Sequence, residues 1–445
     1  MKYKVKLLMF FILLSVSFSK ILFAVKYENN VFIKGVRPMG MGGAFTAIAD
    51  DENAFFYNCA GITQIYEDTL QTFSLRADVD NHVAKAYAFY NENKDDILHF
   101  EDLSPEKQGK FVDKIVSSNM LNCAPNVLVS LPNILFIKRP IDINKSRNSL
   151  NFGLGFFSYA KAIGEIDKGT LLPSLSYKGE ITGVGMLPVA FRIYSLNSLN
   201  LPGVLSLGVN LKYMYRLVNS KEDLSLIEIG KFEFGGNFFD ATAFGVDFGA
   251  IYYLNSRWHF GINATDLYNS QFKYKKSKIH FDDEKKSSST IDTYDPQGIN
   301  PILNIGCAYI PEKLYYWLGK YIYTNDNITF AFDLIDLNNP NESFSLTPFK
   351  KIHIGTECRL TPFSLRVGLN SGYPSFGAGI SLKAVNLEYA FYGEEKGILP
   401  GQDPDWIHSF LVSIRLHWGN KFTKDEEKSI GCSVQRSMTG KMIKK

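Results

Sequence analysis

The chain has 445 residues, of which 45% are hydrophobic, 14% aromatic and 21% charged. Its 35 Phe and 24 Tyr favour strands, and this composition excludes a disordered chain. The net charge is only +3, so no basic excess points to nucleic acid as a partner. The five Cys are scattered without a C-x-x-C pair, which excludes a disulfide framework and a zinc site built on such a pair.

The N-terminus has the pattern of a secretory signal. Three Lys in the first six residues precede an apolar run at positions 7–18, which is too short to span a membrane as a helix. We therefore expect residues 1–24 to be a signal peptide, cleaved after Ala24 or Ser19. An uncleaved signal anchor is the alternative. After residue 24 no apolar run approaches the roughly 18 residues of a spanning helix, so none is expected.

Period-two alternation is the strongest structural signal, and the last candidate strand, residues 406–418, has it most clearly. Phe410 and Val412 stand on a mostly apolar face, Ser409 and Ser413 on the opposite face, and a Trp stands at each end. At about 3.3 Å per residue and a tilt of about 40°, this strand spans roughly 30 Å, the thickness of a bilayer core. The pattern predicts an all-β fold, a transmembrane antiparallel barrel with a polar lumen. A soluble all-β barrel or sandwich is the alternative.

The same alternation recurs in fifteen segments. They are residues 68–77, 82–91, 126–138, 148–160, 181–194, 205–215, 242–254, 257–265, 301–310, 326–336, 352–358, 363–369, 376–382, 385–391 and 406–418. Single-chain barrels normally close with an even number of strands, so we expect one candidate to be wrong and predict about fourteen strands. The segment 126–138 is the weakest candidate because it contains Pro132.

Three other segments lack this alternation. Residues 101–120 predict a short helix, opened by Ser104 and Pro105. The last 27 residues, 419–445, predict a mobile tail. The domain plan is therefore a signal peptide at 1–24, an N-terminal hatch at 25–67, a barrel at 68–418 and this tail.

Residues 35–63 are the most distinctive part of the chain. Closely spaced Gly residues permit tight backbone packing, and several Ala keep the segment slim. Asp50 and Asp51 suit the cap of the following turn, and Asn58 is a turn former. These features predict a compact plug inside the barrel. An N-terminal loop with a short helix is the alternative.

This segment resembles the N-terminal hatch of the FadL-like outer-membrane transporter superfamily, which includes fatty-acid and aromatic-hydrocarbon channels and the PorV-type and TraF-like relatives. The residues that carry the resemblance are Arg37, Gly40, Met41, Gly42, Gly43, Ala44, Ala49, Asp50, Asp51, Asn58, Ala60 and Gly61. Cys59 departs from the family pattern, which usually has Pro there, so a rigid φ is lost. The resemblance implies fourteen strands, periplasmic termini and a hatch that blocks the lumen.

Catalytic motifs are absent, since the chain has neither H-E-x-x-H nor G-x-S-x-G. We expect no enzymatic activity, no cofactor and no bound metal. His353, Glu357 and Arg359 share one strand face, which lumen-facing charge explains, and the acidic run at 282–284 is solvated loop charge.

The expected protein is a monomer in the outer membrane of a diderm bacterium, in contact with membrane lipid. It takes up or binds small hydrophobic, fatty-acid-like compounds. The alternative is a PorV-like barrel that binds secreted or surface proteins and transports no small molecule. The sequence does not name the substrate or the residues of its pocket.

Overall fold

The computed structural model describes most of the chain between residues 33 and 418. The described ranges are 33–65, 68–99, 102–118, 126–130, 133–140, 149–167, 174–193, 202–225, 238–267, 271–276, 297–317, 320–324, 327–338, 348–395, 401 and 404–418. The expected signal peptide, the tail at 419–445 and the acidic run at 282–284 lie outside these ranges. Within them, no helix is long and apolar enough to cross a membrane.

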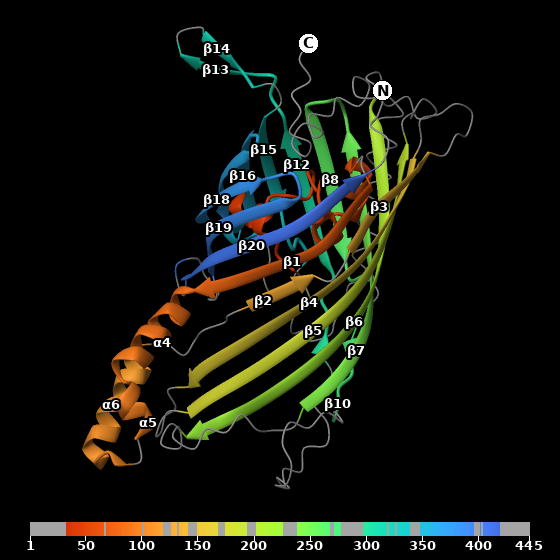
Figure 1. Cartoon of the computed structure of the whole chain (residues 1–445). Helices are drawn as coiled ribbons and strands as arrows, with labels where there is room; N and C mark the ends of the chain where they lie inside the picture. Colours follow the sequence, from red (N-terminus) through yellow and green to blue (C-terminus); the bar gives the residue numbers. More distant parts are fainter. Residues whose placement is uncertain are drawn as a thin grey trace.

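An antiparallel sheet closes on itself to form a barrel (Figure 1). The order around the ring is β7, β6, β5, β4, β2 with β3, β1, β20, β19, β18, β17, β16, β15, β12 and β8, and β8 pairs with β7 to close it. β2 and β3 occupy one position, because both pair with β1 and β4. The described residues thus form fourteen strand positions, which confirms the predicted number.

The bounds of the wall strands follow. They are β1 Asp68–Asp80, β2 Asn126–Ser130, β3 Asn133–Pro140, β4 Ser149–Asp167, β5 Ser174–Ile193, β6 Val204–Ser225, β7 Phe238–Tyr253, β8 Trp258–Thr265, β12 Ile302–Tyr309, β15 Ile328–Leu334, β16 Ile352–Leu360, β17 Phe363–Asn370, β18 Tyr373–Ser381, β19 Val385–Glu395 and β20 Pro404–Trp418. Shorter strands are β9 Gln271–Phe272, β10 Lys275–Lys276, β11 Gln297–Gly298, β13 Lys313–Trp317 and β14 Lys320–Tyr323.

One predicted strand is wrong, and it is not the one singled out as weakest. Residues 82–91 belong to helix α4, Asn81–Glu92, whose first turn is capped by the Asp80 carboxylate accepting from the Val83 amide at 2.8 Å. The segment is rich in Ala, a strong helix former, which overrides its apparent alternation. Residues 126–138 do form strand, interrupted between β2 and β3 next to Pro132.

Three helices connect β1 to β2 and extend away from the barrel wall, drawn in orange in Figure 1. They are α4, α5 at Lys94–Leu98 and α6 at Pro105–Ser118, and α6 confirms the helix expected within 101–120. The rings of Phe89 and Phe111 lie 5.4 Å apart and join α4 to α6. The other helices among the described residues are α2 Val36–Gly40, α3 Ala54–Tyr57, the 3₁₀ helix η1 Cys59–Gln64 and α7 Pro348–Lys351.

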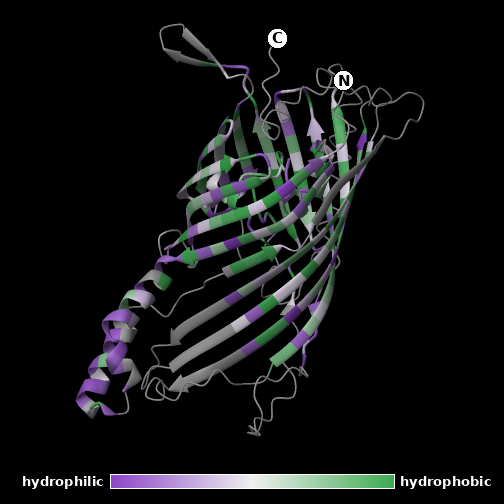
Figure 2. Ribbon diagram, in the orientation of Figure 1, coloured by the Kyte–Doolittle hydropathy of each residue, from purple (hydrophilic) through white to green (hydrophobic). Residues whose placement is uncertain are grey.

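The strand faces are inverted relative to a soluble barrel. On β20, Phe410 and Val412 are 51% and 43% exposed, whereas Ser409 and Ser413 are fully buried. Green apolar positions recur along the wall in Figure 2, and the exposed large side chains are mainly Leu, Phe, Val and Ile. A wall that turns its apolar face outward needs lipid around it, so the transmembrane barrel is confirmed over the soluble alternative.

Aromatic residues mark both ends of the lipid-facing band. At one end Trp406 stacks on Phe391, with ring centroids 5.3 Å apart. At the other end Trp258 packs on Tyr309 at 4.5 Å, and Trp418 ends β20. Aromatic side chains of this kind favour the two membrane–water interfaces. The end with Trp418 also holds the short turns at 254–257, 361–362 and 382–384, and we call it the short-turn end.

The wall is much longer on one side than on the other. β5 and β6 have 20 and 22 residues, whereas β17 and β18 have 8 and 9. Figure 1 shows β4 to β7 continuing well past the end of the blue strands, away from the short-turn end. The lumen is therefore bounded there by β4 to β7.

Candidate functional site

Residues 33–65, hereafter the N-terminal segment, lie against the inner faces of strands around the barrel. α2 contacts β17, β18, β19 and β20, and η1 contacts β4, β5, β6 and β7. Every residue from 35 to 51 is buried, as is every residue from 53 to 65. A segment of three short helical turns therefore occupies the lumen, where it is shielded from solvent by the wall.

A left-handed turn ends the first helix. Gly42 and Gly43 have φ angles of +66° and +83°, values that a residue with a Cβ rarely adopts. The Gly43 amide donates to the Pro38 carbonyl at 2.8 Å, which closes the end of α2. Nδ1 of His353 on β16 donates to the Gly42 carbonyl at 2.6 Å. This turn is thus held by both its own backbone and the wall.

Glycines on the wall let the segment approach as closely as another strand would. A Cβ on Gly208 would lie 2.6 Å from Ala60 N, and one on Gly368 would lie 2.5 Å from Gly42 N. Wall glycines on eight strands have the N-terminal segment among their nearest contacts: Gly153 and Gly155 on β4, Gly208 on β6, Gly249 on β7, Gly261 on β8, Gly306 on β12, Gly355 on β16, Gly368 on β17 and Gly377 on β18. At most of these positions a Cβ would lie closer to the segment than real Cβ atoms do, so this belt of glycines creates the space that the segment fills.

Arg37 is the centre of a buried ion network. Its Nη1 donates to Asp50 at 2.5 Å and to Asp51 at 2.7 Å, and it also pairs with Glu357 on β16, through Nε at 2.9 Å and Nη2 at 2.7 Å. The guanidinium therefore joins two parts of the segment to the wall at once. A bidentate pair of this kind fixes direction as well as distance.

Three wall arginines complete the network. Arg366 donates to Glu357 at 2.8 Å, Arg359 lies 3.5 Å from Asp50, and Arg415 pairs with Glu52. His353, Glu357 and Arg359 thus face the lumen, as expected, and each contacts the segment or its partners.

The pKa values of two neighbouring buried carboxyl groups of the segment shift in opposite directions. For Asp51, desolvation is outweighed by the charges of Arg37 and Arg415, which lower its pKa below the usual range. For Glu52, desolvation dominates, and with Asp51 and Glu388 nearby it raises the pKa to about 7 despite Arg415. The lowered pKa keeps Asp51 ionised at neutral pH, whereas the raised pKa of Glu52 favours partial protonation there.

Asn58 and Asp333 hold the rest of the segment by its backbone. The Asn58 amide donates to the carbonyls of Thr46 at 2.9 Å, Ala250 at 3.2 Å and Ile262 at 3.3 Å. Its oxygen accepts from the Ala60 amide and caps η1. Oδ2 of Asp333 on β15 accepts from the amides of Phe45 and Thr46, both at 2.7 Å.

All twelve residues that carry the hatch resemblance are buried, and those that contact the wall form two groups. Arg37, Asp50 and Asp51 meet in the ion network, whereas Asn58 and Ala60 lie against β6 to β8. Cys59, which stands where the family has Pro, begins η1 and is buried, and burial raises the pKa of its thiol far above the usual range. No motif in the sequence marks Asp333 or the wall glycines as contacts of the segment. The one sequence feature that could have pointed to them is the recurrence of Gly and acidic residues on the polar faces of the predicted strands.

Large apolar side chains cover the inner wall beyond α3. Phe157 packs edge-on against Phe55 and Phe56, with ring centroids 5.5 and 4.7 Å apart. The buried apolar cluster continues along β5, β6 and β7 through Val184, Met186, Met214, Val218 and Phe239, and it includes Phe272 and Tyr274. The lumen next to α3 is therefore lined, on the side of the long strands, by an apolar cluster that lies beside the buried pair of Arg216 and Glu180.

Two cavities flank the segment in the described part of the chain. The first is polar, has a volume of about 60 Å³, and lies between the ion network and the turns at 361–362 and 382–384. The second, of about 10 Å³, lies between Phe55, Phe56 and Met186 and reaches a buried ion cluster of Lys212 with Asp247 and Asp266. No group of His, Cys, Asp and Glu among the described residues is arranged to hold a metal ion.

Residues 140–320 match the family model described as F plasmid transfer operon, TraF, protein. TraF-like proteins are among the relatives named for the hatch resemblance, so this match agrees with it. No curated protein sequence matches the chain.

Solved structures similar to the chain include hydrocarbon transporters. The toluene transporter TodX of Pseudomonas putida has 11% identity and a TM-score of 0.43, over 87% of this chain and 98% of that chain. The toluene transporter TbuX of Ralstonia pickettii has 11% identity and a TM-score of 0.43, over 88% of this chain and 100% of that chain. A FadL homologue of Pseudomonas aeruginosa has 12% identity and a TM-score of 0.38, over 88% of this chain and 99% of that chain. At these values the fold of this chain rests on its own strand register.

Proposed function

We propose that this chain is an outer-membrane barrel that takes up or binds small hydrophobic compounds, and that its N-terminal segment is a hatch in the lumen. One observation carries the proposal. The inner wall beyond α3 carries a continuous apolar cluster beside two buried ion groups, Lys212 with Asp247 and Asp266 and Arg216 with Glu180, whereas the lumen of a transmembrane barrel is normally polar throughout. Val184, Met186 and Met214 have no lipid to face there, so they suit an apolar solute.

The arrangement answers a physical problem. A hydrophobic compound crosses the polar outer leaflet poorly, and an apolar surface inside the barrel removes its water at low cost. Phe55 and Phe56 of the segment form the inner boundary of this surface. Passage beyond them requires the segment to shift, because its backbone is in contact with wall glycines on several strands.

A matched pair of variants tests the binding surface. Met186 points into the lumen and its neighbour Leu187 points to lipid, so Met186→Gln and Leu187→Gln differ mainly in the face that changes. The probe is N-phenyl-1-naphthylamine, whose fluorescence rises in apolar surroundings. We expect Met186→Gln to weaken binding about tenfold or more and Leu187→Gln less than twofold. Equal binding by the two variants would overturn the proposal.

A second experiment tests the hatch. The segment contributes no strand to the ring, so a protein that lacks residues 40–61 should still close its barrel. In reconstituted vesicles we expect it to leak small polar dyes faster than the intact protein. Equal leakage from two folded samples, each shown by heat-dependent gel mobility, would contradict a hatch.

The alternative function is a barrel that binds secreted or surface proteins without transport. The small volumes of the two described cavities, about 60 and 10 Å³, favour it, because neither has room for a fatty-acid-like compound. Uptake of the same probe into vesicles that contain a trapped hydrophobic acceptor distinguishes the two functions. Uptake above that of protein-free vesicles supports transport, and its absence in folded protein supports the alternative.

A further inference from the structure

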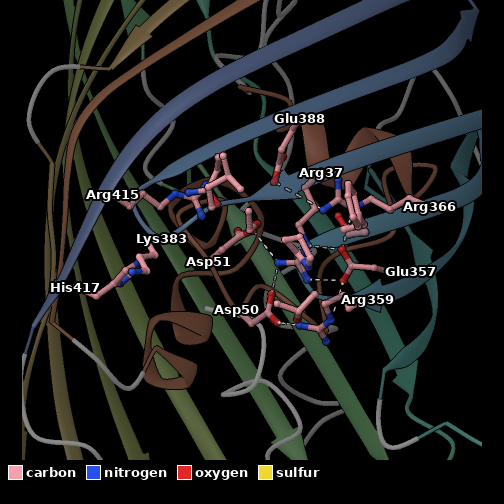
Figure 3. A pocket seen from close by; sticks show the side chains of 17 residues that line it. Arg37, Asp50, Asp51, Glu357, Arg359, Arg366, Lys383, Glu388, Arg415 and His417 are labelled. Atoms are coloured by element: carbon pink, nitrogen blue, oxygen red, sulfur yellow. Dashed lines mark hydrogen bonds and ion pairs between the residues drawn. The ribbon is translucent and has the colours of Figure 1, made fainter. Parts of the chain in front are cut away.

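The polar cavity at the short-turn end has the features of a binding site for a ligand. Arg37, Asp50 and Asp51 of the N-terminal segment form its floor, and side chains of β16 to β20 form its walls (Figure 3). Its mouth lies at the turns 361–362 and 382–384, next to the exposed Lys383. It is separate from the apolar wall of the proposed uptake path, which lies beyond α3.

Two buried arginines that line this cavity keep unused donors. Arg366 is 5% exposed, and no described residue accepts a hydrogen bond from its Nη1, although its Nε donates to Glu357. Arg415 is 6% exposed, and its Nε likewise has no acceptor among the described residues, although its Nη2 pairs with Glu52. An unsatisfied buried donor is costly, so these atoms favour an acceptor in the cavity.

Charge in the cavity also favours an anion. Its lining has five cationic side chains, Arg37, Arg359, Arg366, Lys383 and Arg415, against the four carboxylates of Asp50, Asp51, Glu357 and Glu388. His417 lines it too and bonds to Thr69 at 3.0 Å. Glu52 pairs with Arg415 from outside the lining, and with a pKa of about 7 it is only partly ionised at neutral pH. When Glu52 is protonated, the cavity therefore has one more cationic group than carboxylates and has room for one negative charge.

We propose that this cavity binds one small monocarboxylate anion, which enters from the short-turn end and accepts hydrogen bonds from Arg366 and Arg415. A carboxylate matches the planar donor geometry of guanidinium groups. The cavity volume of about 60 Å³ suits a group of acetate size, and a phosphate dianion would add a second negative charge among four carboxylates. The proposal of an anion site does not depend on whether the barrel transports hydrophobic compounds.

Binding of ¹³C-labelled acetate to the full-length protein in detergent tests the site, with chloride holding the ionic strength constant. Asn386 lines the cavity, and Asn386→Asp adds a negative charge there without a change in size. We expect this variant to bind acetate at least tenfold more weakly. Lys383→Gln, at the exposed mouth, should weaken binding about threefold, and Lys110→Gln on the distant α6 should leave it unchanged.

Acidity gives an independent test. Glu52 faces Arg415, Asp51 and Glu388, and its protonation below pH 7 removes a negative charge beside the site. Acetate should therefore bind about threefold more tightly at pH 6 than at pH 8, and Glu52→Gln should abolish this dependence while retaining binding. Acetate binding equal in the wild type and Asn386→Asp would overturn the site. Tighter binding of phosphate than of acetate would also overturn it.

Discussion

Arg37 and Glu357 are 320 positions apart in the chain, yet two charge-assisted hydrogen bonds of 2.9 and 2.7 Å join them inside the barrel. The Glu357 side chain is fully buried and also accepts from Arg366. One carboxylate on β16 therefore pairs with an arginine of the N-terminal segment and with an arginine of the wall. This contact joins the segment to β16.

Glu357→Gln should destabilise the folded barrel. The substitution leaves two buried guanidinium groups without their shared anion, and breaking a buried pair typically costs about 3–5 kcal/mol. Thermal unfolding followed by heat-dependent gel mobility measures the effect. Glu106→Gln is the control, because Glu106 pairs with Lys110 on the exposed surface of α6. Similar unfolding temperatures for both variants would show that the network does not hold the protein together.

Gly208→Ala should displace the N-terminal segment. The new Cβ would lie 2.6 Å from Ala60 N, so either the segment or β6 must move. Cys59, now buried, should then react with a maleimide in a protein whose other Cys are replaced by Ser. Gly183→Ala on β5 is the matched control, since nothing lies within 4 Å of a Cβ there. Equal labelling of the two variants would contradict the close contact between segment and wall.

Leu387→Asp and Asn386→Asp place the same carboxylate on opposite faces of β19. Leu387 is 40% exposed to lipid and pairs with Val412 near the middle of β20, so its replacement should cost up to about 2–3 kcal/mol and hinder assembly. Asn386 lines the polar cavity among arginines, where the charge has partners. The amount of heat-modifiable barrel in outer membranes reports the difference. The reverse order would mean that the faces are assigned wrongly.

Asn58→Asp should loosen η1 although the side chains have nearly the same shape. The amide donates to three carbonyl oxygens, and a carboxylate in its place donates to none of them. Loss of buried partners costs about 1–3 kcal/mol, and repulsion from the carbonyls adds to it. Faster maleimide labelling of Cys59 checks the loosening. Unchanged labelling and unfolding would show that these bonds contribute little.

The sequence predicted most of the wall because alternation is a local property. Phe410 and Ser409 already separate into two faces in the printed chain, and the structure confirms which face is outside. The failure at 82–91 has the same origin. Residues that alternate over a few positions also fit a helix, and here the Ala content and the cap by Asp80 both favour the helix.

The motif at 37–61 was recognisable, but its contacts were not. Arg37, Asp50 and Asp51 lie close in sequence, so their association could be anticipated from the chain. Their partners Glu357 and Arg359 had no motif of their own and read only as lumen-facing charge. Asp333, which holds the backbone of Phe45 and Thr46, resembled any inward acidic residue of a barrel.

The sequence by itself determined the two faces of each strand and the small, glycine-rich nature of the N-terminal segment, because period-two alternation and backbone freedom are properties of neighbouring residues. Only the tertiary structure decided where that segment lies. Ring closure by β7 and β8 brings Gly208, Gly368 and Glu357 from distant parts of the chain to one lumen. Close contact and burial of charge arise from that closure, and no local pattern encodes them.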